Sequence, residues 1–247
     1  MKKYGLIGYP LTHSFSKRFF TEKFEKEKVD AVYENFEMKD ISWFQDVVRR
    51  NPSLVGLNVT IPYKQQVIPF LNELDEAAEE VGAVNTIKIK RIGERIHLKG
   101  YNTDIWGFET SLKPLLKNYH KKALILGTGG ASKAIKYVLK KLKIDFISAS
   151  IEELQENEVK YQDIDKKMMA ERLLIINATP LGTFPNVDTF PPIPYPYVTG
   201  RHLLFDLVYN PETTRFMEMG KEKGAVVKNG YDMLLQQALK SYEIWNT

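Results

Sequence analysis

The stretch KKALILGTGGASKAIKYVLKKL, residues 121–142, decides the fold class. An apolar run ends at Gly127, and a run with helical periodicity and lysines on one face follows within a few residues. A strand, a glycine turn and a helix in immediate succession are the building unit of open parallel α/β sheets. The sequence therefore predicts an α/β protein that contains a Rossmann-type dinucleotide-binding turn.

The glycines of this turn have separate physical roles. Gly127 permits a tight turn, Gly129 lets a pyrophosphate approach the backbone, and free amides at the helix start meet its negative charge. Ser132 occupies the place of the third glycine of the usual fingerprint. The alternative is a tight turn that binds no ligand.

The strand expected after this helix ends DFISAS at residues 145–150, followed by Glu152 and Glu153. Neither an acidic residue nor an arginine stands at Ser148–Ser150, where NAD or NADP would be distinguished. The residues alone leave the choice of cofactor open.

Strands and helices alternate on both sides of this stretch. Strands are expected at 3–8, 31–36, 54–59, 145–148, 173–177, 203–206 and 225–228, with a hairpin formed by AVNTIKIK and RIHLKGYN. Helices are expected at 16–27, 40–50, 64–70, 75–81, 104–118 and 232–245, and the proline-dense segment 183–198 is expected to be an extended loop. A break near residue 103 predicts two α/β domains with a cleft between them.

The composition excludes several classes of protein. The 247 residues are 43% hydrophobic and 27% charged, with a net charge of +4 and scattered lysines, which predicts a soluble globular protein without nucleic-acid partners. No apolar run approaches the roughly 20 residues that cross a bilayer. The absence of cysteine agrees with a cytoplasmic location. Four scattered histidines, at 13, 97, 120 and 202, predict no metal site, and His13 is expected to be structural.

The segment GLNVTIPYK, residues 56–64, leaves a strand with polar residues at its exit. Pro62 favours the first turn of a helix, so Lys64 is expected near the positive end of a helix dipole. A lysine balanced between that dipole and a nearby carboxylate can exchange a proton at neutral pH, with Asn58 and Thr60 beside it. The alternatives are a solvated Lys64 and an Asp104 that only caps a helix.

Eight strings occur in a fixed order along the chain: GYPLTHSFS, NVTIPYK, GAVNT, GYNTD, GTGGA, NATPLG, DLVYNPETT and NGYDMLLQQA. This ordered set, which spans residues 8–238, resembles the shikimate dehydrogenase family. The resemblance implies reversible reduction of 3-dehydroshikimate to shikimate with NADPH, in aromatic amino-acid biosynthesis. It also implies a substrate domain at residues 1–103, a Rossmann-like cofactor domain at 104–230, and a C-terminal helix, 231–247, that joins the first domain.

The resemblance assigns roles residue by residue. It implies a catalytic pair, Lys64 and Asp104. Substrate contacts are implied for Ser14, Ser16, Thr60, Asn85, Tyr209 and Gln237. Cofactor contacts are implied for Gly127, Thr128, Gly129, Gly130, Ala131, Asn177, Thr179, Leu207 and Gly230. Ser14 and Ser16 could equally cap the helix that starts near Lys17.

The chain departs from the family pattern at three places. Lys17 replaces a proline, Ile105 replaces a glycine, and Ala149 stands where the family has the arginine that pairs with the 2′-phosphate of NADP. NAD use is therefore possible unless Lys133 or Lys160 compensates. The alternatives are a quinate/shikimate dehydrogenase that uses NAD and a dinucleotide-binding sensor without turnover; monomer and homodimer both remain open.

Overall fold

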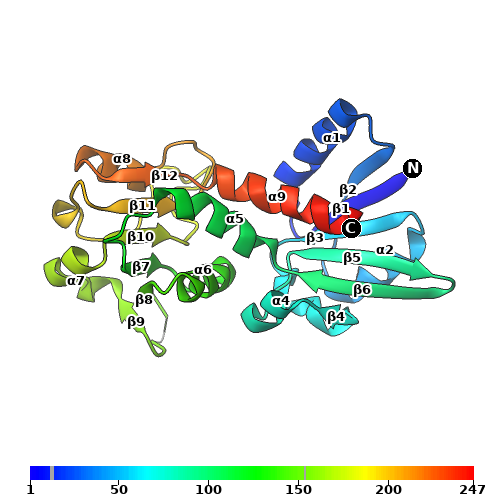
Figure 1. Cartoon of the computed structure of the whole chain (residues 1–247), viewed down its shortest axis with the longest axis horizontal. Coiled ribbons are helices and arrows are strands. Elements are labelled where there is room, and N and C mark those ends of the chain that lie inside the picture. The colour runs from blue at the N-terminus through cyan, green and yellow to red at the C-terminus, as the bar shows by residue number, and fades with distance from the viewer. Residues whose placement is uncertain (12–13, 153) are drawn as a thin grey trace. The chain divides into compact units, whose positions relative to one another are not determined.

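The computed structural model describes residues 1–11, 14–152 and 154–247. The expectations for His13 and Glu153 lie outside these residues. The chain forms two compact units: unit 1 comprises Met1–Thr103 and Ala238–Thr247, and unit 2 comprises Asp104–Gln237. Each contains one sheet with helices, so the α/β class is confirmed (Figure 1).

Unit 1 is built on a six-stranded mixed sheet in the order β2-β1-β3-β5-β6-β4. Its strands are β1 Lys2–Gly8, β2 Ala31–Glu37, β3 Leu54–Val59, β4 Glu73–Leu74, β5 Thr86–Ile92 and β6 Arg95–Tyr101. Its helices are α1 Phe15–Glu27, α2 Phe44–Arg50, α3 Tyr63–Gln66 and α4 Glu76–Val81, with 3-10 turns at Ile41–Trp43 and Ile68–Phe70. The three N-terminal strands are parallel, and β5 and β6 form the expected antiparallel hairpin.

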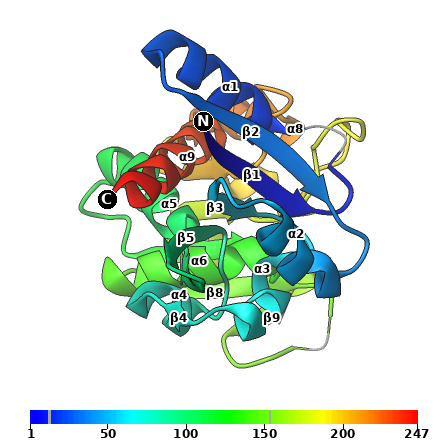
Figure 2. The same ribbon diagram turned by 90° about the vertical axis from the view of Figure 1, so that its right-hand side faces the viewer.

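Both faces of this sheet are covered. Strand alternation sends Tyr4 and Leu6 to a cluster with α1 and Trp245, whereas Ile7 joins a cluster with α2 on the other face. Figure 2 shows α1 beside β1 and β2. Trp245 packs so closely on β3 that a Cβ added at Gly56 would lie 2.5 Å from its ring. The aromatic ending of the chain is therefore packing, as expected.

Unit 2 is built on a parallel sheet in the order β12-β11-β10-β7-β8-β9, and these strands succeed one another in Figure 1. The strands are β7 Lys122–Leu126, β8 Asp145–Ser150, β9 Glu158–Lys160, β10 Leu174–Asn177, β11 Leu203–Asp206 and β12 Val226–Lys228. The helices are α5 Thr103–Leu112, α6 Gly130–Lys141, α7 Lys166–Glu171, α8 Arg215–Glu222 and α9 Tyr231–Asn246, with 3-10 turns at Lys113–Leu115, Tyr161–Asp163 and Tyr195–Tyr197. Helix α5 starts at the last residue of unit 1, and α9 ends in unit 1.

Three predicted helices are shorter than expected. The helix expected at 40–50 divides into a 3-10 turn and α2, and the one expected at 64–70 divides into α3 and a second 3-10 turn. Helix α5 ends at Leu112 and passes into a 3-10 turn, because Pro114 has no backbone N–H to continue the α-helical hydrogen bonds. The short strands β4 and β9 and helices α7 and α8 were not predicted, since their apolar patterns are too brief to show a period.

In the described ranges no helix is long and apolar enough to cross a membrane.

Candidate functional site

Several predicted site residues lie at the end of the unit 1 sheet where β1 and β3 terminate, called here the polar edge of unit 1. The carboxyl ends of β1 and β3 lie side by side there, and the Thr60 backbone nitrogen donates to the Ile7 carbonyl at 3.0 Å. Antiparallel β5 begins at the same edge, where the Val59 nitrogen donates to the Asn85 carbonyl at 2.8 Å. Thr60 and Asn85 are therefore neighbours, as strand ends of a mixed sheet allow.

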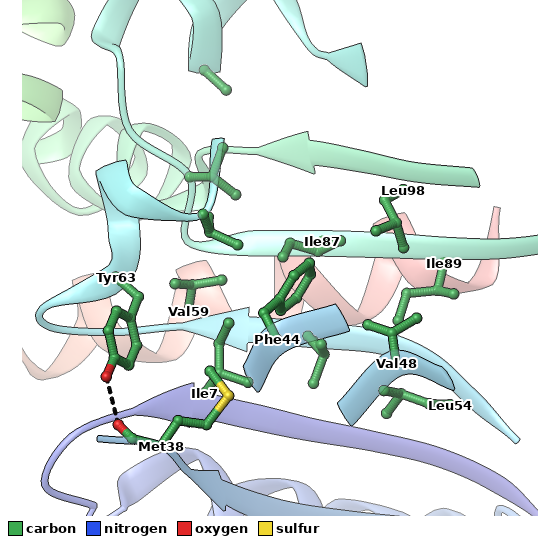
Figure 3. Packing of buried hydrophobic residues seen from close by; sticks show 14 residues of the cluster. Ile7, Met38, Phe44, Val48, Leu54, Val59, Tyr63, Ile87, Ile89 and Leu98 are labelled. Atoms are coloured by element: carbon green, nitrogen blue, oxygen red, sulfur yellow. Dashed lines mark hydrogen bonds between the residues drawn. The ribbon is translucent and has the colours of Figure 1, made fainter. Parts of the chain in front are cut away.

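Lys64 is carried by a firmly held backbone. Its neighbour Tyr63 is only 3% exposed, packs in the core, and donates its hydroxyl hydrogen to the Met38 carbonyl at 2.5 Å (Figure 3). The Lys64 carbonyl accepts from the Val84 nitrogen at 2.7 Å. The lysine side chain is half-buried, and α3 is a single turn, so the expected dipole comes from a few peptides only.

Asp104 lies in the first turn of α5. The expectation that it is the N-cap is wrong, because the helix already begins at Thr103. A carboxylate in the first turn is still favourably placed near the positive helix end. Thr103 itself is fixed by Asn85, whose Oδ1 accepts from the Thr103 nitrogen at 2.7 Å and from its hydroxyl at 3.1 Å.

Asn58 does not line an open strand mouth, contrary to expectation. It is 4% exposed, accepts from the Tyr33 hydroxyl at 2.8 Å and donates to the Ser241 hydroxyl at 3.0 Å. Ser241 also contacts the hydroxyl of Thr86 at 2.7 Å. This buried network ties α9 to the sheet, so the role of Asn58 is structural. Sequence reasoning missed Ser241, which carries no local signal.

Ser14 and Ser16 occupy the start of α1. Ser14 is the N-cap and accepts from the Lys17 nitrogen at 3.1 Å, which confirms the capping interpretation. Ser16 hydrogen-bonds to the Tyr33 phenol. Burial raises the pKa of that phenol, and the bond to Ser16 opposes the rise only in part. Lys17 is exposed and, together with Ser14, lines a groove of about 520 Å³.

The glycine turn of unit 2 has the geometry that a dinucleotide requires. Gly127 has φ +98°, and a Cβ there would lie 2.8 Å from the Thr179 methyl carbon. At Gly129 and Gly130 an added Cβ would meet no described atom within 4 Å. Neither packing nor a left-handed φ therefore demands glycine at these two positions, and the open space above them leaves room for a ligand to approach the backbone.

Helix α6 starts directly at this turn, with Gly129 as its N-cap. Within the described residues no side chain caps its first amides, so Gly130 and Ala131 present N–H groups to an anion. Ser132 is buried and donates its hydroxyl hydrogen to the Gly129 carbonyl at 2.6 Å. Its small side chain keeps the helix close to the sheet, as expected, and the residues fit a bound pyrophosphate.

Asn177 is fully buried, with 0% exposure, and the cofactor contact implied for it stays a prediction. Its Oδ1 accepts from the nitrogen and hydroxyl of Thr179, at 3.1 and 2.6 Å. Thr179, half-buried beside Gly127, is the residue of this pair that can face a ligand.

The carboxyl end of β11 carries a charged group that sequence reasoning missed. Asp206 is 0% exposed, and burial raises its pKa to about 6, against the lowering effect of its hydrogen bonds from Thr214, Val208 and Asn177. The available signal was an aspartate that ends the apolar run LLFD.

Two predicted cofactor residues, Leu207 and Gly230, lie directly against each other. A Cβ at Gly230 would lie 2.1 Å from the Leu207 carbonyl oxygen, so only glycine fits.

Two predicted substrate residues also belong to unit 2. Tyr209 is 39% exposed, and Gln237 lies on α9 against Gly107, one turn beyond Asp104.

Ala149 cannot occupy the place of a phosphate-binding arginine. It is 0% exposed and packs in the hydrophobic cluster of unit 2, so an arginine there would point into the core. The first open position after β8 is Ile151, which is 91% exposed. Lys160 on β9 is in register with Ser150, so their side chains share a face of the sheet at this exit.

In the described part of the chain no group of three His, Asp or Glu side chains could hold a metal ion.

Comparison with known proteins agrees with these features. The family model for the shikimate dehydrogenase substrate binding domain matches residues 6–87. Shikimate dehydrogenase (NADP(+)) of Caldicellulosiruptor saccharolyticus is 36% identical, over 99% of this chain and 92% of its own. That of Desulforamulus reducens is 35% identical, over 98% of this chain and 88% of its own.

A solved structure extends the agreement to three dimensions. Shikimate 5-dehydrogenase of Listeria monocytogenes, in complex with shikimate and NAD, is 30% identical with a TM-score of 0.87, over 100% of this chain and 92% of its own. Identity at this level along the whole chain, together with the glycine turn and the Lys64 and Asp104 segments, leads to one assignment: the chain belongs to the shikimate dehydrogenase family.

Proposed function

We propose that the protein is an NADP-dependent shikimate dehydrogenase, which reversibly reduces 3-dehydroshikimate to shikimate. The observation that carries the proposal is full-length similarity to enzymes of that name, with the polar edge of unit 1 and the glycine turn of unit 2 both intact. Unit 1 is the substrate domain and unit 2 the cofactor domain. The enzyme acts in the cytoplasm, as a monomer or homodimer, within aromatic amino-acid biosynthesis.

Substrate contacts are assigned to Ser14, Ser16, Thr60 and Asn85, and to Tyr209 and Gln237. The hydroxyls of Ser14 and Ser16, at the start of α1, hold the substrate carboxylate, because helix-start groups attract anions. Thr60, Asn85, Tyr209 and Gln237 hold the ring hydroxyls. Asn85 contributes its amide nitrogen, since its oxygen is occupied by Thr103.

Lys64 is the general acid. Its ammonium donates a proton to the oxygen that develops negative charge as the C3 carbonyl is reduced, and takes the proton back in the reverse direction. Asp104 accepts a hydrogen bond from the reacting hydroxyl and orients it. The nicotinamide, when bound, supplies the hydride. The anchored backbone on both sides of Lys64 supports this role, because general acid catalysis requires fixed geometry.

The dinucleotide is assigned to the carboxyl edge of the unit 2 sheet. Gly127–Ala131 hold the pyrophosphate with backbone amides, and Thr179, Leu207 and Gly230 line the rest of the edge. NADP is the preferred form, with Lys160 as the cation for the 2′-phosphate.

A second candidate is a quinate/shikimate dehydrogenase that also uses NAD. The exit of β8, from Ser148 to Glu152, carries no cation, which favours this candidate, and the Listeria enzyme was solved with NAD.

Steady-state rates with shikimate and with quinate, each with NADP⁺ and NAD⁺, test these proposals. We expect the highest kcat/KM with shikimate and NADP⁺. Equal rates with quinate and NAD⁺ would favour the second candidate. Nucleotide binding without turnover would refute both and indicate a sensor.

A further inference from the structure

A single carboxylate joins three segments at the carboxyl edge of the unit 2 sheet. Asp206 Oδ1 accepts from the Val208 nitrogen at 3.0 Å and from Asn177 Nδ2 at 2.9 Å. Its Oδ2 accepts from the Thr214 hydroxyl at 2.5 Å. Thr214 is the N-cap of α8, so β10, β11 and α8 are all tied to one side chain.

One arm of this network leads to the glycine turn. An amide has a donating end and an accepting end, and Asp206 can only accept. The bond from Asn177 Nδ2 therefore forces Oδ1 to face the other way, toward the nitrogen and hydroxyl of Thr179. The Thr179 methyl in turn closes on Gly127. The carboxylate thus sets the orientation of Asn177, and Asn177 sets the position of Thr179.

The other arm leads to Gly230. The bond from the Val208 nitrogen to Asp206 fixes the turn that follows β11. The Val208 carbonyl then accepts from the Gly230 nitrogen at 3.0 Å, and Gly230 lies directly against Leu207. Both arms therefore end on residues assigned to the dinucleotide, although Asp206 itself is fully buried.

The network is built on a buried carboxylate, which argues that Asp206 does more than fill space in the core. Over the residues that the structure describes, no lysine or arginine forms an ion pair with Asp206. Burying a carboxylate without a counter-ion is unfavourable, and burial accordingly raises its pKa. The Asp206 carboxylate accepts from three donors at once, so it fixes the geometry of all three. These hydrogen bonds offset part of the cost of its burial.

We propose that Asp206 is a positioning residue for the dinucleotide: its carboxylate orients Asn177 and the 206–208 turn, so that Thr179, Leu207 and Gly230 meet the cofactor in one fixed geometry. The proposal rests on the proposed function, in that unit 2 binds NADP. Asp206 touches no cofactor and acts only through its hydrogen-bond partners.

The direct test compares three variants of the full chain. Asp206→Leu removes every acceptor, and we expect the Kd for NADP⁺ to rise on the order of tenfold. Asp206→Asn is the conservative variant: its amide oxygen can still accept from Asn177, while its nitrogen can donate to the Thr214 hydroxyl, which is able to accept. We therefore expect Asp206→Asn to restore most of the affinity.

His202→Phe is the matched control. His202 immediately precedes the amino end of the same strand, is 1% exposed, and hydrogen-bonds to Thr199 and Met169 at 3.0 Å each. Its loss should lower the melting temperature without changing the Kd for NADP⁺. The Kd for shikimate, measured without nucleotide, should be unchanged in all three variants. In steady state, Asp206→Leu should raise KM for NADP⁺ more than it lowers kcat.

Two results would overturn the proposal: Asp206→Leu binding NADP⁺ within twofold of wild type, or His202→Phe weakening NADP⁺ binding equally. If the leucine variant does not fold, Asp206→Ser replaces it with the same expectation, because serine is too short to reach Asn177.

Failure of the proposed function can be told apart from failure of the Asp206 proposal, because the former is seen in the wild-type protein. Wild-type protein that binds NADP⁺ without oxidising shikimate refutes the function yet still allows the Asp206 comparison, whereas wild type that binds no nucleotide refutes both.

Discussion

The side-chain oxygen of Asn85 accepts a hydrogen bond from the backbone nitrogen of Thr103 at 2.7 Å. The preceding residue, Val84, donates its own nitrogen to the Lys64 carbonyl, also at 2.7 Å. Residues 84 and 85 therefore bind the backbone that carries Lys64 on one side and the residue before Asp104 on the other. A short buried segment thus fixes both candidate catalytic segments.

Removing Asn85 should reduce both stability and substrate binding. In Asn85→Ala the buried Thr103 nitrogen loses its acceptor, which should cost about 1–3 kcal/mol of unfolding free energy. The lost amide should raise KM for shikimate roughly tenfold. Urea unfolding and steady-state kinetics measure the two effects. Thr103→Val keeps the backbone nitrogen and removes the hydroxyl contacts to Asn85, Thr86 and Ser241, so it should lose stability without raising KM. A wild-type KM in Asn85→Ala would contradict the assigned contact.

Replacing Lys64 should act on the chemical step. We expect Lys64→Ala to lower kcat by roughly 10²–10⁴-fold, the usual contribution of general acid–base catalysis, while the protein remains folded. Gln65→Ala, at the exposed neighbouring position, is the control and should retain wild-type kcat. A kcat close to wild type in Lys64→Ala would refute the general-acid assignment.

Variants of the glycine turn should affect stability and nucleotide binding separately. Gly127→Ala should destabilise the protein, because alanine disfavours φ +98° and its Cβ would press on Thr179. Gly129→Ala should leave the melting temperature unchanged, since its Cβ meets open space, but should weaken NADP⁺ binding tenfold or more by blocking close approach. Thermal unfolding and nucleotide titration distinguish the two. Unaltered NADP⁺ affinity in Gly129→Ala would place the cofactor elsewhere.

Cofactor preference should depend on Lys160. Lys160→Ala should weaken NADP⁺ binding about tenfold and leave NAD⁺ binding unchanged, because only NADP⁺ carries the 2′-phosphate. Lys133→Ala, on the exposed part of α6, tests the other candidate cation in parallel. Ile151→Arg should raise the preference for NADP⁺ by placing a cation at the open exit of β8. Equal losses for both nucleotides in Lys160→Ala would count against a phosphate contact.

Stability should depend on pH through Asp206. The folded protein holds this proton up to about pH 6, whereas an unfolded aspartate releases it near pH ~4. The contribution of Asp206 to stability is therefore fully present below pH ~4 and is lost as the pH rises to about 6, by about 3 kcal/mol. Unfolding free energies of wild type minus Asp206→Asn, measured across this range, should fall accordingly. A flat difference would mean that Asp206 is not desolvated.

Much of the architecture was determined by the sequence alone. Short apolar runs bounded by glycine, proline or polar residues located β1, β3, β7 and β11, because such runs are typical of strands buried on both faces. The glycine turn was predictable as a turn between strand and helix, since the requirement for φ > 0 at Gly127 is local. Eight ordered strings then indicated the family, which full-length similarity confirms.

Only the tertiary structure decided which polar residues face outward. Asn58, Asn177 and Ala149 were expected at open positions, and all three are buried. Asp206 and Ser241 had no predicted role, yet each joins segments far apart in the chain. A residue type reports what a side chain can bond to, but its partners come from strands and helices brought together by folding. Burial and hydrogen-bond direction are therefore properties of the packed fold, and no local pattern specifies them.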